Sequence, residues 1–245
     1  MTLYLSLLAL EPHARAVRRD LADCHALHRT VMSAFPDIPA NAAGGGGDAR
    51  ARLGVLHRLE IHPRTGAPSL LVQSAAAPEW SALLDAGYLA PGAHPAVKPV
   101  AHLYDALTAG TALRFRLRAN PTRRLSTPAG PDGARPPGKR VDLRDEAAQL
   151  AWLARKGEQG GFRLLDARAH PGLPNVRADP VPAPPGRRPV ADRPAHRLTF
   201  GAVLFEGALA VTDPSTFRRV LAEGIGSAKA YGFGLLSIAP LGGAG

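Results

Sequence analysis

The order of the predicted strands and helices constrains the fold of this chain more than any single motif does. In the first half, apolar alternation and helical periodicity predict the series strand, helix, strand, strand, helix, strand. These elements are a strand at 2–10, a helix at 13–35 that could break near Asp23, strands at 55–61 and 69–73, a short helix at 79–84 and a strand at 112–119. This order is that of a ferredoxin-like unit.

The second half of the chain follows the same order more loosely. Its predicted elements are a helix at 144–156, strands at 162–165 and 199–205, a strand at 208–211 after a turn at Glu206 and Gly207, a helix at 215–223 and a strand at 234–239. We therefore expect an α+β protein of two tandem ferredoxin-like, RRM-like domains, at residues 1–120 and 121–245. The repeat is inferred from the order of elements, because no sequence identity between the halves is visible.

A glycine-rich segment from Gly224 to Leu236 carries one lysine and two aromatic residues just before the last predicted strand. A backbone without side chains can approach a polyanion closely. The spacing matches neither G-x-G-x-x-G nor G-x-x-x-x-G-K-[ST], which excludes the nucleotide-cofactor motifs. A phosphate-binding loop and a tight structural turn are both open. If the segment binds phosphate, the candidate residues are Gly224, Gly226, Lys229, Gly232 and Gly234.

The charge of the chain favours a polyanionic partner. There are 30 Lys and Arg residues against 20 Asp and Glu, a net charge of +10, which is typical of proteins that bind RNA or DNA. Arg114, Arg116 and Arg118 alternate with apolar residues, so they share one face of the predicted strand. Further cations follow at Arg123, Arg124, Lys139 and Arg140. The alternative is a solvated strand face without a ligand.

Three segments rich in proline or glycine are predicted to be linkers or loops outside the core. They are residues 36–50, 127–138 and 171–194. The middle segment lies between two groups of cations. It could order into a hairpin on contact with RNA, or it could be a plain flexible loop.

The composition also argues against several other classes of protein. At 45% hydrophobic residues the chain can bury real cores, and its single cysteine, Cys24, excludes an internal disulfide and a cysteine-based zinc site. No apolar run approaches the ~20 residues of a membrane helix, and the N-terminus lacks the pattern of a signal peptide. We therefore expect a cytoplasmic protein. The acidic residues are scattered, so neither a metal nor another cofactor is expected.

The candidate catalytic residues lie on the first long helix. His28 falls at the edge of its apolar stripe, and His25 lies one turn earlier on the same side. Arg29, four residues after His25, can join them in one patch. A neutral imidazole there could accept a proton. The alternative is that these histidines are merely packed or exposed side chains.

With these residues assembled, the chain resembles the CasE family, the endoribonucleases that process CRISPR RNA in type I-E systems. The matching motifs are Arg19-Asp20-Leu21 with His28, Phe35-Pro36, Phe115-Arg116-Leu117-Arg118-Ala119-Asn120-Pro121, Gly138-Lys139-Arg140-Val141, Ala151-Trp152-Leu153, Phe205-Glu206-Gly207 and the glycine-rich segment. The resemblance covers most of the chain outside the proline- and glycine-rich segments. It implies two RAMP-type ferredoxin-like domains, in agreement with the order of elements.

The resemblance also implies a reaction. A CasE enzyme cleaves the CRISPR repeat at the 3′ base of its hairpin without metal, by attack of a 2′-hydroxyl, and leaves a 2′,3′-cyclic phosphate and a 5′-hydroxyl. It then stays on the mature crRNA with the other Cascade subunits. The family's catalytic histidine corresponds to His28, and His25 stands where the family usually has tyrosine. Candidate RNA-binding cations are Arg29, Arg116, Arg118, Arg123, Arg124, Lys139, Arg140 and Lys229.

Two other functions are compatible with the same residues. A catalytically silent subunit could use the tandem fold only to hold an RNA hairpin. A general basic RNA chaperone would bind a repeat hairpin no better than a scrambled one. Cleavage of a repeat transcript in the presence of a chelator distinguishes the enzyme from both.

Overall fold

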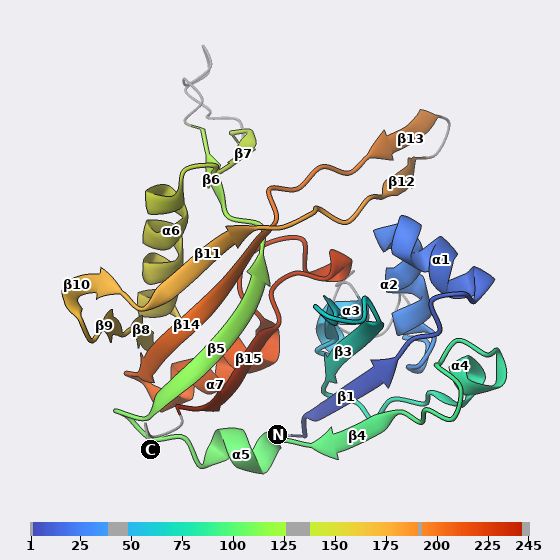
Figure 1. Ribbon diagram of the computed structural model, residues 1–245, viewed down its shortest axis with the longest axis horizontal. Helices are drawn as coiled ribbons and strands as arrows, with labels where there is room; N and C mark the ends of the chain where they lie inside the picture. The colour runs from blue at the N-terminus through green and yellow to red at the C-terminus, as the bar shows by residue number, and fades with distance from the viewer. Residues whose placement is uncertain (1, 39–48, 126–137, 191–192, 242–245) are drawn as a thin grey trace.

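The computed structural model describes residues 2–38, 49–125, 138–190 and 193–241 (Figure 1). Its first sheet has the strand order β2-β3-β1-β4, with every pair antiparallel. The elements of this first unit are β1 (Tyr4–Ala9), α1 (Arg15–Ala22), α2 (Cys24–Met32), α3 (Ala49–Arg52), β2 (Leu56–Ile61), β3 (Pro68–Ser74), α4 (Ser81–Asp85) and β4 (Ala96–Pro99). This strand order is the ferredoxin-like one.

The second sheet repeats that order. Its strands run β11-β14-β5-β15, and β8 pairs with the same strand, β14, as β11 does, so β8 and β11 together occupy the second-strand position. The elements of this second unit are β5 (Ala112–Ala119), α6 (Glu146–Gln159), β8 (Phe162–Leu164), β11 (Val176–Pro180), β14 (Val203–Val211), α7 (Pro214–Glu223) and β15 (Leu236–Pro240). The prediction of two ferredoxin-like units is confirmed.

Smaller elements connect and extend the two units. They are α5 (Ala101–Asp105), the hairpins β6 (Thr122–Arg124) with β7 (Arg140–Asp142), β9 (Asp166–Ala167) with β10 (His170–Pro174) and β12 (Arg187–Val190) with β13 (Arg193–Arg197), and the short helix η1 (Lys229–Tyr231). In Figure 1 the β12–β13 hairpin of the second unit extends toward α1 and α2 of the first. No helix of the described residues is long and apolar enough to cross a membrane.

The break between α1 and α2 has a local cause. Asp23 has an extended backbone, and its side chain accepts a hydrogen bond from the His25 backbone N–H at 3.0 Å. The side chain thus satisfies one of the free N–H groups at the start of α2. The predicted helix break near Asp23 is confirmed.

Alternation along β5 separates an apolar face from a basic one. Leu113, Phe115 and Leu117 are buried in the core of the second unit, beneath α6 and α7. Because successive side chains of a strand point to opposite faces, the arginines between them lie on the face without helices. The predicted division of this strand is confirmed.

Buried polar side chains join the two units. From β2, Arg58 donates to the Leu235 carbonyl at 3.0 Å and to the Ser237 hydroxyl at 2.9 Å. From β3, the Gln73 amide donates to the Leu221 carbonyl at 2.7 Å. These donors satisfy carbonyl and hydroxyl groups of the second unit that burial removes from water. The two units therefore meet through specific hydrogen bonds.

The strand at 112–119 was predicted to belong to the first unit, but it lies in the sheet of the second unit. It forms as expected, but it pairs with β14 and β15 in the second sheet. The fourth strand of the first sheet is instead β4, a short element that contains Lys98 and ends at Pro99, so its sequence gives little strand signal. We therefore propose that the units divide before β5 rather than at residue 120.

Two further expectations for the second half were wrong. A turn was predicted at Glu206 and Gly207, but β14 runs through both residues. A Cβ on Gly207 would collide with the Asn175 carbonyl, so this glycine permits close approach of β11 rather than a turn. The segment at 171–194 was predicted to be a loop, yet it contains β11, an edge strand, where Pro180 is tolerated.

Candidate active site

His28 lies where the two units meet. Its ring is 6.5 Å from the ring of His57 on β2, with the planes 21° apart, and 6.5 Å from the ring of Tyr231 on η1. One neighbour comes from the first unit and the other from the glycine-rich segment of the second. The tertiary fold thus brings the predicted catalytic histidine and the predicted glycine-rich segment together.

His57 is an uncharged neighbour of His28. It is fully buried, and burial, reinforced by nearby positive charge, lowers the pKa of His57 to about 3. The ring is therefore neutral at pH 7. Neither ring nitrogen has a hydrogen-bond partner among the described residues, which is uncommon for buried polar groups. Sequence reasoning missed this residue, and the one signal that could have found it is a histidine within the apolar pattern of a predicted strand.

The two residues predicted to accompany His28 lie on the same helix, α2. His25 lies in the first turn of α2, as predicted, where its backbone N–H donates to the Asp23 side chain. Arg29 is exposed on the same helix. The roles of both residues stay predictions.

Asp20 anchors α2 close to His28. Its buried carboxylate accepts hydrogen bonds from the Thr30 hydroxyl at 2.6 Å, the Tyr88 hydroxyl at 2.9 Å and the Arg19 guanidinium at 2.7 Å. Burial beside this carboxylate raises the pKa of Tyr88 above its usual range, so the phenol stays a donor. Because Thr30 is two residues beyond His28, the network holds the segment of helix that carries the imidazole.

The glycine-rich segment is a tight turn at its two ends. Gly224 has φ +77°, and a Cβ there would lie 2.8 Å from the Gly234 carbonyl and 2.9 Å from Leu56. The Ile225 N–H donates to that same Gly234 carbonyl at 2.9 Å. The structural alternative therefore explains Gly224 and Gly234 without any ligand. Their assignment to RNA contact stays a prediction.

The middle of the segment is different. A Cβ on Gly232 would have only ordinary contacts, the nearest being His57 Nε2 at 3.6 Å. A Cβ on Gly226 would lie 3.2 Å from the Trp152 ring, which is a tight contact with a side chain rather than with the backbone. At Gly224 the missing side chain lets another part of the backbone come close. At Gly232 it leaves space beside the imidazole of His57 instead.

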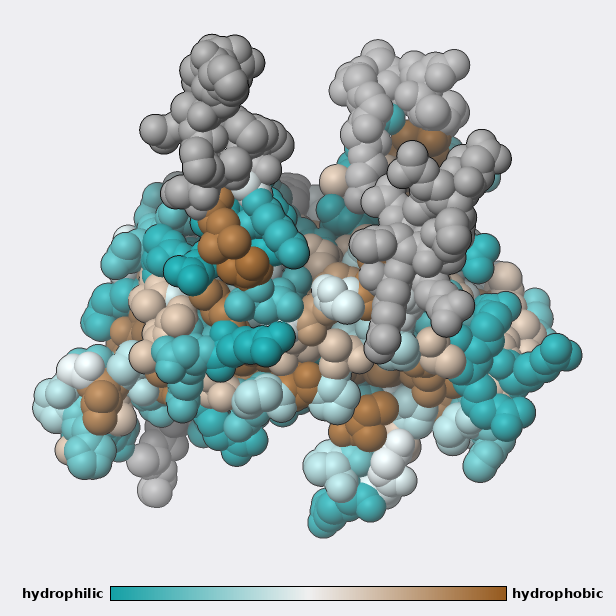
Figure 2. Space-filling model, turned by 90° about the horizontal axis from the view of Figure 1, so that it is seen from above, coloured by the Kyte–Doolittle hydropathy of each residue, from teal (hydrophilic) through white to brown (hydrophobic). Residues whose placement is uncertain are grey.

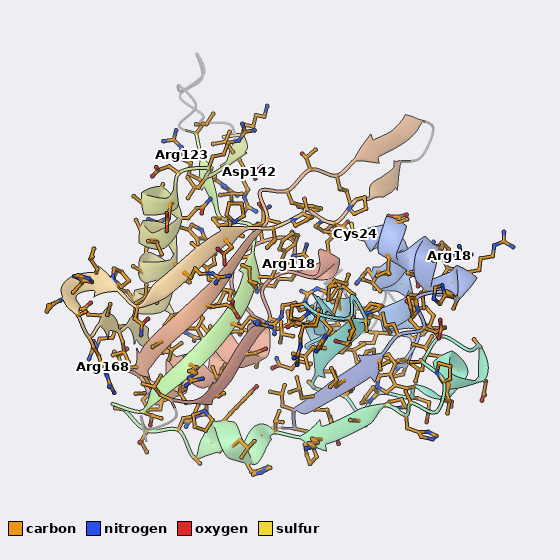
Figure 3. All side chains as sticks on the ribbon, in the orientation of Figure 1. Arg18, Cys24, Arg118, Arg123, Asp142 and Arg168 are labelled. Atoms are coloured by element: carbon orange, nitrogen blue, oxygen red, sulfur yellow. The ribbon has the colours of Figure 1, made fainter. Side chains whose placement is uncertain are left out.

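Arg118 is held by protein groups. Its guanidinium lies 5.3 Å from the centre of the Phe233 ring and donates to the Pro182 carbonyl at 2.6 Å. Burial lowers the pKa of Arg118. Figure 3 shows the side chain in the middle of the molecule, between the two units. The geometry thus gives Arg118 existing partners that a phosphate would have to replace.

The exposed cations gather around the β6–β7 hairpin. Arg123, Arg124, Lys139 and Arg140 are all exposed there, and Figure 3 shows Arg123 near the top of the second unit. Figure 2 shows hydrophilic side chains over this part of the surface. The segment at 127–138, for which ordering on RNA and a plain flexible loop were both open, lies almost entirely outside the described residues. The predicted basic cluster is thus brought together in space.

A basic pocket of about 470 Å³ adjoins the hairpin. Cations of α6, the hairpin and η1 line it, namely Arg124, Arg140, Lys156 and Lys229. Burial, together with Arg50, lowers the pKa of Lys229. Lys156 was not predicted, because its place on α6 gives no hint of its neighbours in space. Among the described residues, no group of three or more His, Cys, Asp or Glu side chains could hold a metal ion.

Known proteins with similar sequences decide the family. A family model described as CRISPR associated protein matches residues 3–240. The chain is 38% identical over 238 residues to the CRISPR-associated endoribonuclease Cse3 of Thermus thermophilus, covering 97% of this chain and 100% of the relative. It is 31% identical over 236 residues to the CRISPR system Cascade subunit CasE of Escherichia coli, covering 93% and 96%. The chain belongs to the CasE family of CRISPR-associated proteins.

The fold agrees with this family. A structure of CRISPR endoribonuclease Cse3 bound to a 19-nucleotide RNA matches with a TM-score of 0.76 and 38% identity, over 98% of this chain and 100% of that chain. Two of the CasE-like motifs, the one with Arg116 and the one with Glu206, lie on neighbouring strands of the second sheet. Arg116 donates to Glu206 at 2.7 Å and to Glu60 at 2.8 Å, so its charge is already neutralised by carboxylates. Its predicted contact with RNA has no support from this geometry.

The tight turn of this CasE-family protein predicts a steep cost for Gly224→Ala. The new methyl group would meet the Gly234 carbonyl, and alanine disfavours the positive φ. We expect a loss of about 2–4 kcal/mol in the free energy of unfolding, measured by urea titration. The matched control is Gly110→Ala, where φ is +85° but no described atom lies within 4 Å of the added Cβ. Equal losses in both variants would contradict the proposed close approach.

Proposed function

We propose that this protein cleaves CRISPR repeat RNA at the 3′ base of its hairpin, without metal, and acts in the cytoplasm. The observation that carries the proposal is the position of His28, held by α2 between His57 and Tyr231 where the two units meet. The 38% identity to the Thermus thermophilus endoribonuclease supports the same activity. A histidine without a metal is sufficient for acid–base chemistry on a ribose hydroxyl.

The reaction transfers a phosphoryl group within the RNA, from the 5′-oxygen of one nucleotide to the 2′-oxygen of the nucleotide before it. The 2′-oxygen attacks the adjacent phosphorus, the bond from phosphorus to the 5′-oxygen breaks, and a 2′,3′-cyclic phosphate and a 5′-hydroxyl result. The proton of the 2′-hydroxyl is removed and the leaving oxygen gains one, so no net proton is consumed. His28 serves as general base or general acid in this exchange. We assign Lys229, which is on the same short helix as Tyr231, the role of stabilising the charge on the phosphate.

The exposed cations of the β6–β7 hairpin and the basic pocket form the proposed RNA-binding surface. Double-stranded RNA is bound mainly through its shape and its phosphates, which suits a stem held on a cationic surface. A stem occupies such a surface before and after cleavage. We therefore propose that the product crRNA stays bound and that the other Cascade subunits assemble around it.

Incubation of the protein with a repeat transcript in EDTA tests the proposed activity. Cleavage at the 3′ base of the hairpin, with a 2′,3′-cyclic phosphate end, is expected. A protein that binds the hairpin but never cuts it would be the non-catalytic RNA-binding subunit. Equal affinity for repeat and scrambled hairpins would instead indicate a general RNA chaperone.

The salt dependence of binding should identify the cations that contact phosphate. We expect log affinity to fall with log salt by about 0.7–0.9 for each phosphate neutralised. Lys139→Ala and Lys229→Ala should each flatten that slope by about one unit, because each removes one contact. The measurement is hairpin affinity across a range of salt concentrations.

Arg168→Ala is the matched control for these two variants. Figure 3 places Arg168 at the opposite end of the second unit from Arg123, and the residue is exposed. Its removal should leave the slope unchanged. Identical slopes for all of the proteins would show that Lys139 and Lys229 do not form the RNA-binding surface.

A further inference from the structure

A second pocket lies between the two units, next to the candidate active site. Its volume is about 440 Å³, within the range of small-molecule sites. His57 and Tyr231 line it, and these are the two rings that lie 6.5 Å from the ring of His28. The pocket therefore opens beside the residue proposed to carry out proton transfer, and the mechanism above leaves it without a role.

The walls of this pocket are mostly apolar and come from both units. They include Leu21, Leu27, Leu59, Val181, Pro182 and Leu204. A strap, defined here as residues 181–185, forms one side and is fixed at two points. The Cys24 N–H donates to the Pro185 carbonyl at 2.8 Å, and Arg118 donates to the Pro182 carbonyl at 2.6 Å. The strap thus ties β11 of the second unit to α2 of the first.

Two buried polar groups in the wall lack partners. Both ring nitrogens of His57, a residue with 0% exposure, and the Nε of Arg118 make no hydrogen bond with any described residue. Buried polar groups normally have partners, and each exception calls for an explanation. A ligand with a polar edge, seated among the apolar side chains, would supply them.

The charges of the pocket disfavour a phosphate as that ligand. Arg58 and Arg116, which also line it, are both paired with the Glu60 carboxylate at 2.7 and 2.8 Å. The imidazole of His57 is neutral at pH 7. The pocket thus presents apolar faces, one neutral imidazole and one free guanidinium N–H, which complement a flat heteroaromatic ring with polar atoms on its edge.

We propose that this pocket binds one unpaired nucleobase of the RNA, from a nucleotide that flanks the cleaved phosphodiester. The inference rests on the proposed function, because only an RNA cut beside His28 places such a base here. Unpaired RNA bases are commonly splayed out, stacked between side chains and hydrogen-bonded at their edges. His57 and Arg118 contact the edge of the base, and Leu204 and Leu27 pack against its faces. Gly232, beside His57 Nε2, leaves room for it.

Affinity measurements with an uncleavable RNA test this pocket independently of catalysis. The probe is the repeat hairpin with its single-stranded flanks and a 2′-deoxy sugar at the cleaved position, made with all bases or with an abasic nucleotide on the 5′ or the 3′ side of the cut. One of the two abasic probes should bind the wild type about 10-fold or more weaker, since stacking one base typically contributes that much. The side that responds identifies the bound nucleotide.

A pocket-filling substitution completes the test. Leu204→Trp should weaken binding of the complete probe about 10-fold, and the abasic probe should then bind it as well as the complete one. Val181→Trp on the strap provides a second filling variant in case the first does not fold. Leu173→Trp, an exposed leucine on β10, is the matched control and should behave as the wild type.

The outcomes separate this inference from the proposed function. If the wild type cuts normal repeat RNA but binds all three uncleavable probes equally, the base-binding pocket is wrong and the endoribonuclease stands. An abasic penalty that persists unchanged in both filling variants would place the base elsewhere and also overturn the inference. If an abasic penalty is found without any cleavage of normal RNA, the pocket stands and the proposed catalysis fails.

Discussion

His28→Ala should slow single-turnover cleavage of a repeat hairpin in EDTA by about 10²-fold or more, because general acid–base catalysis typically contributes that much. The affinity for an uncleavable 2′-deoxy hairpin should barely change, since His28 lies between two rings of the protein rather than on the cationic surface. Separate measurements of rate and affinity distinguish a catalytic role from a structural one. The expected signature is a large loss of rate with unchanged binding.

His102→Ala is the control for this substitution. It removes an exposed histidine from α5, far along the chain from the candidate active site, and should keep the wild-type rate. A His28→Ala protein of normal rate would contradict the assignment of His28 as the catalytic residue.

The same assay decides the role of His25. If His25 replaces the family's tyrosine, His25→Phe should be slow and His25→Tyr should recover most of the rate.

Arg58→Met should lower the free energy of unfolding by about 3 kcal/mol. The Arg58 side chain is 4% exposed and pairs with Glu60 at 2.7 Å. It also donates to the Leu235 carbonyl and the Ser237 hydroxyl across the contact between the units. Methionine fills similar space but donates nothing, so buried acceptors of the second unit lose their partner. Urea unfolding measures the effect.

The size of this loss depends on burial, and a surface arginine provides the comparison. Arg18 is exposed on α1, and Figure 3 shows it pointing away from the molecule. Arg18→Met should change the free energy of unfolding by no more than about 0.5 kcal/mol. If Arg58→Met is equally mild, the hydrogen bonds between the units contribute little to stability. Burial lowers the pKa of Arg58, because removing a charged group from water disfavours its charged form.

Local signals in the sequence predicted most of the elements but not all of their partners. Asp23 caps α2 through its own side chain and the N–H two residues on, so a short window of sequence contains that information. The pairing of β5 is different, because Arg116 faces Glu206 and Ser237, 90 and 121 residues further along. Periodicity identifies such a strand but cannot say which sheet it joins.

The candidate site shows the same division. The helical pattern singled out His28, and the glycine spacing singled out Gly232, but their meeting through His57 and Tyr231 is a property of the tertiary fold. Charge composition likewise predicted a basic surface, but it does not reveal which cations are already paired with carboxylates. Arg116 is neutralised by carboxylates from two other strands, one of them in the other unit, and no local pattern contains that information.

The most direct test of the proposed activity is single-turnover cleavage in EDTA of two repeat hairpins that differ only in the 2′-hydroxyl at the cleaved position. The ribose form should yield a 2′,3′-cyclic phosphate and a 5′-hydroxyl at a rate that depends on His28. The 2′-deoxy form should bind with similar affinity and remain intact, because it lacks the nucleophile. Cleavage of both forms at the same rate, or products with a 5′-phosphate, would contradict attack by the 2′-hydroxyl.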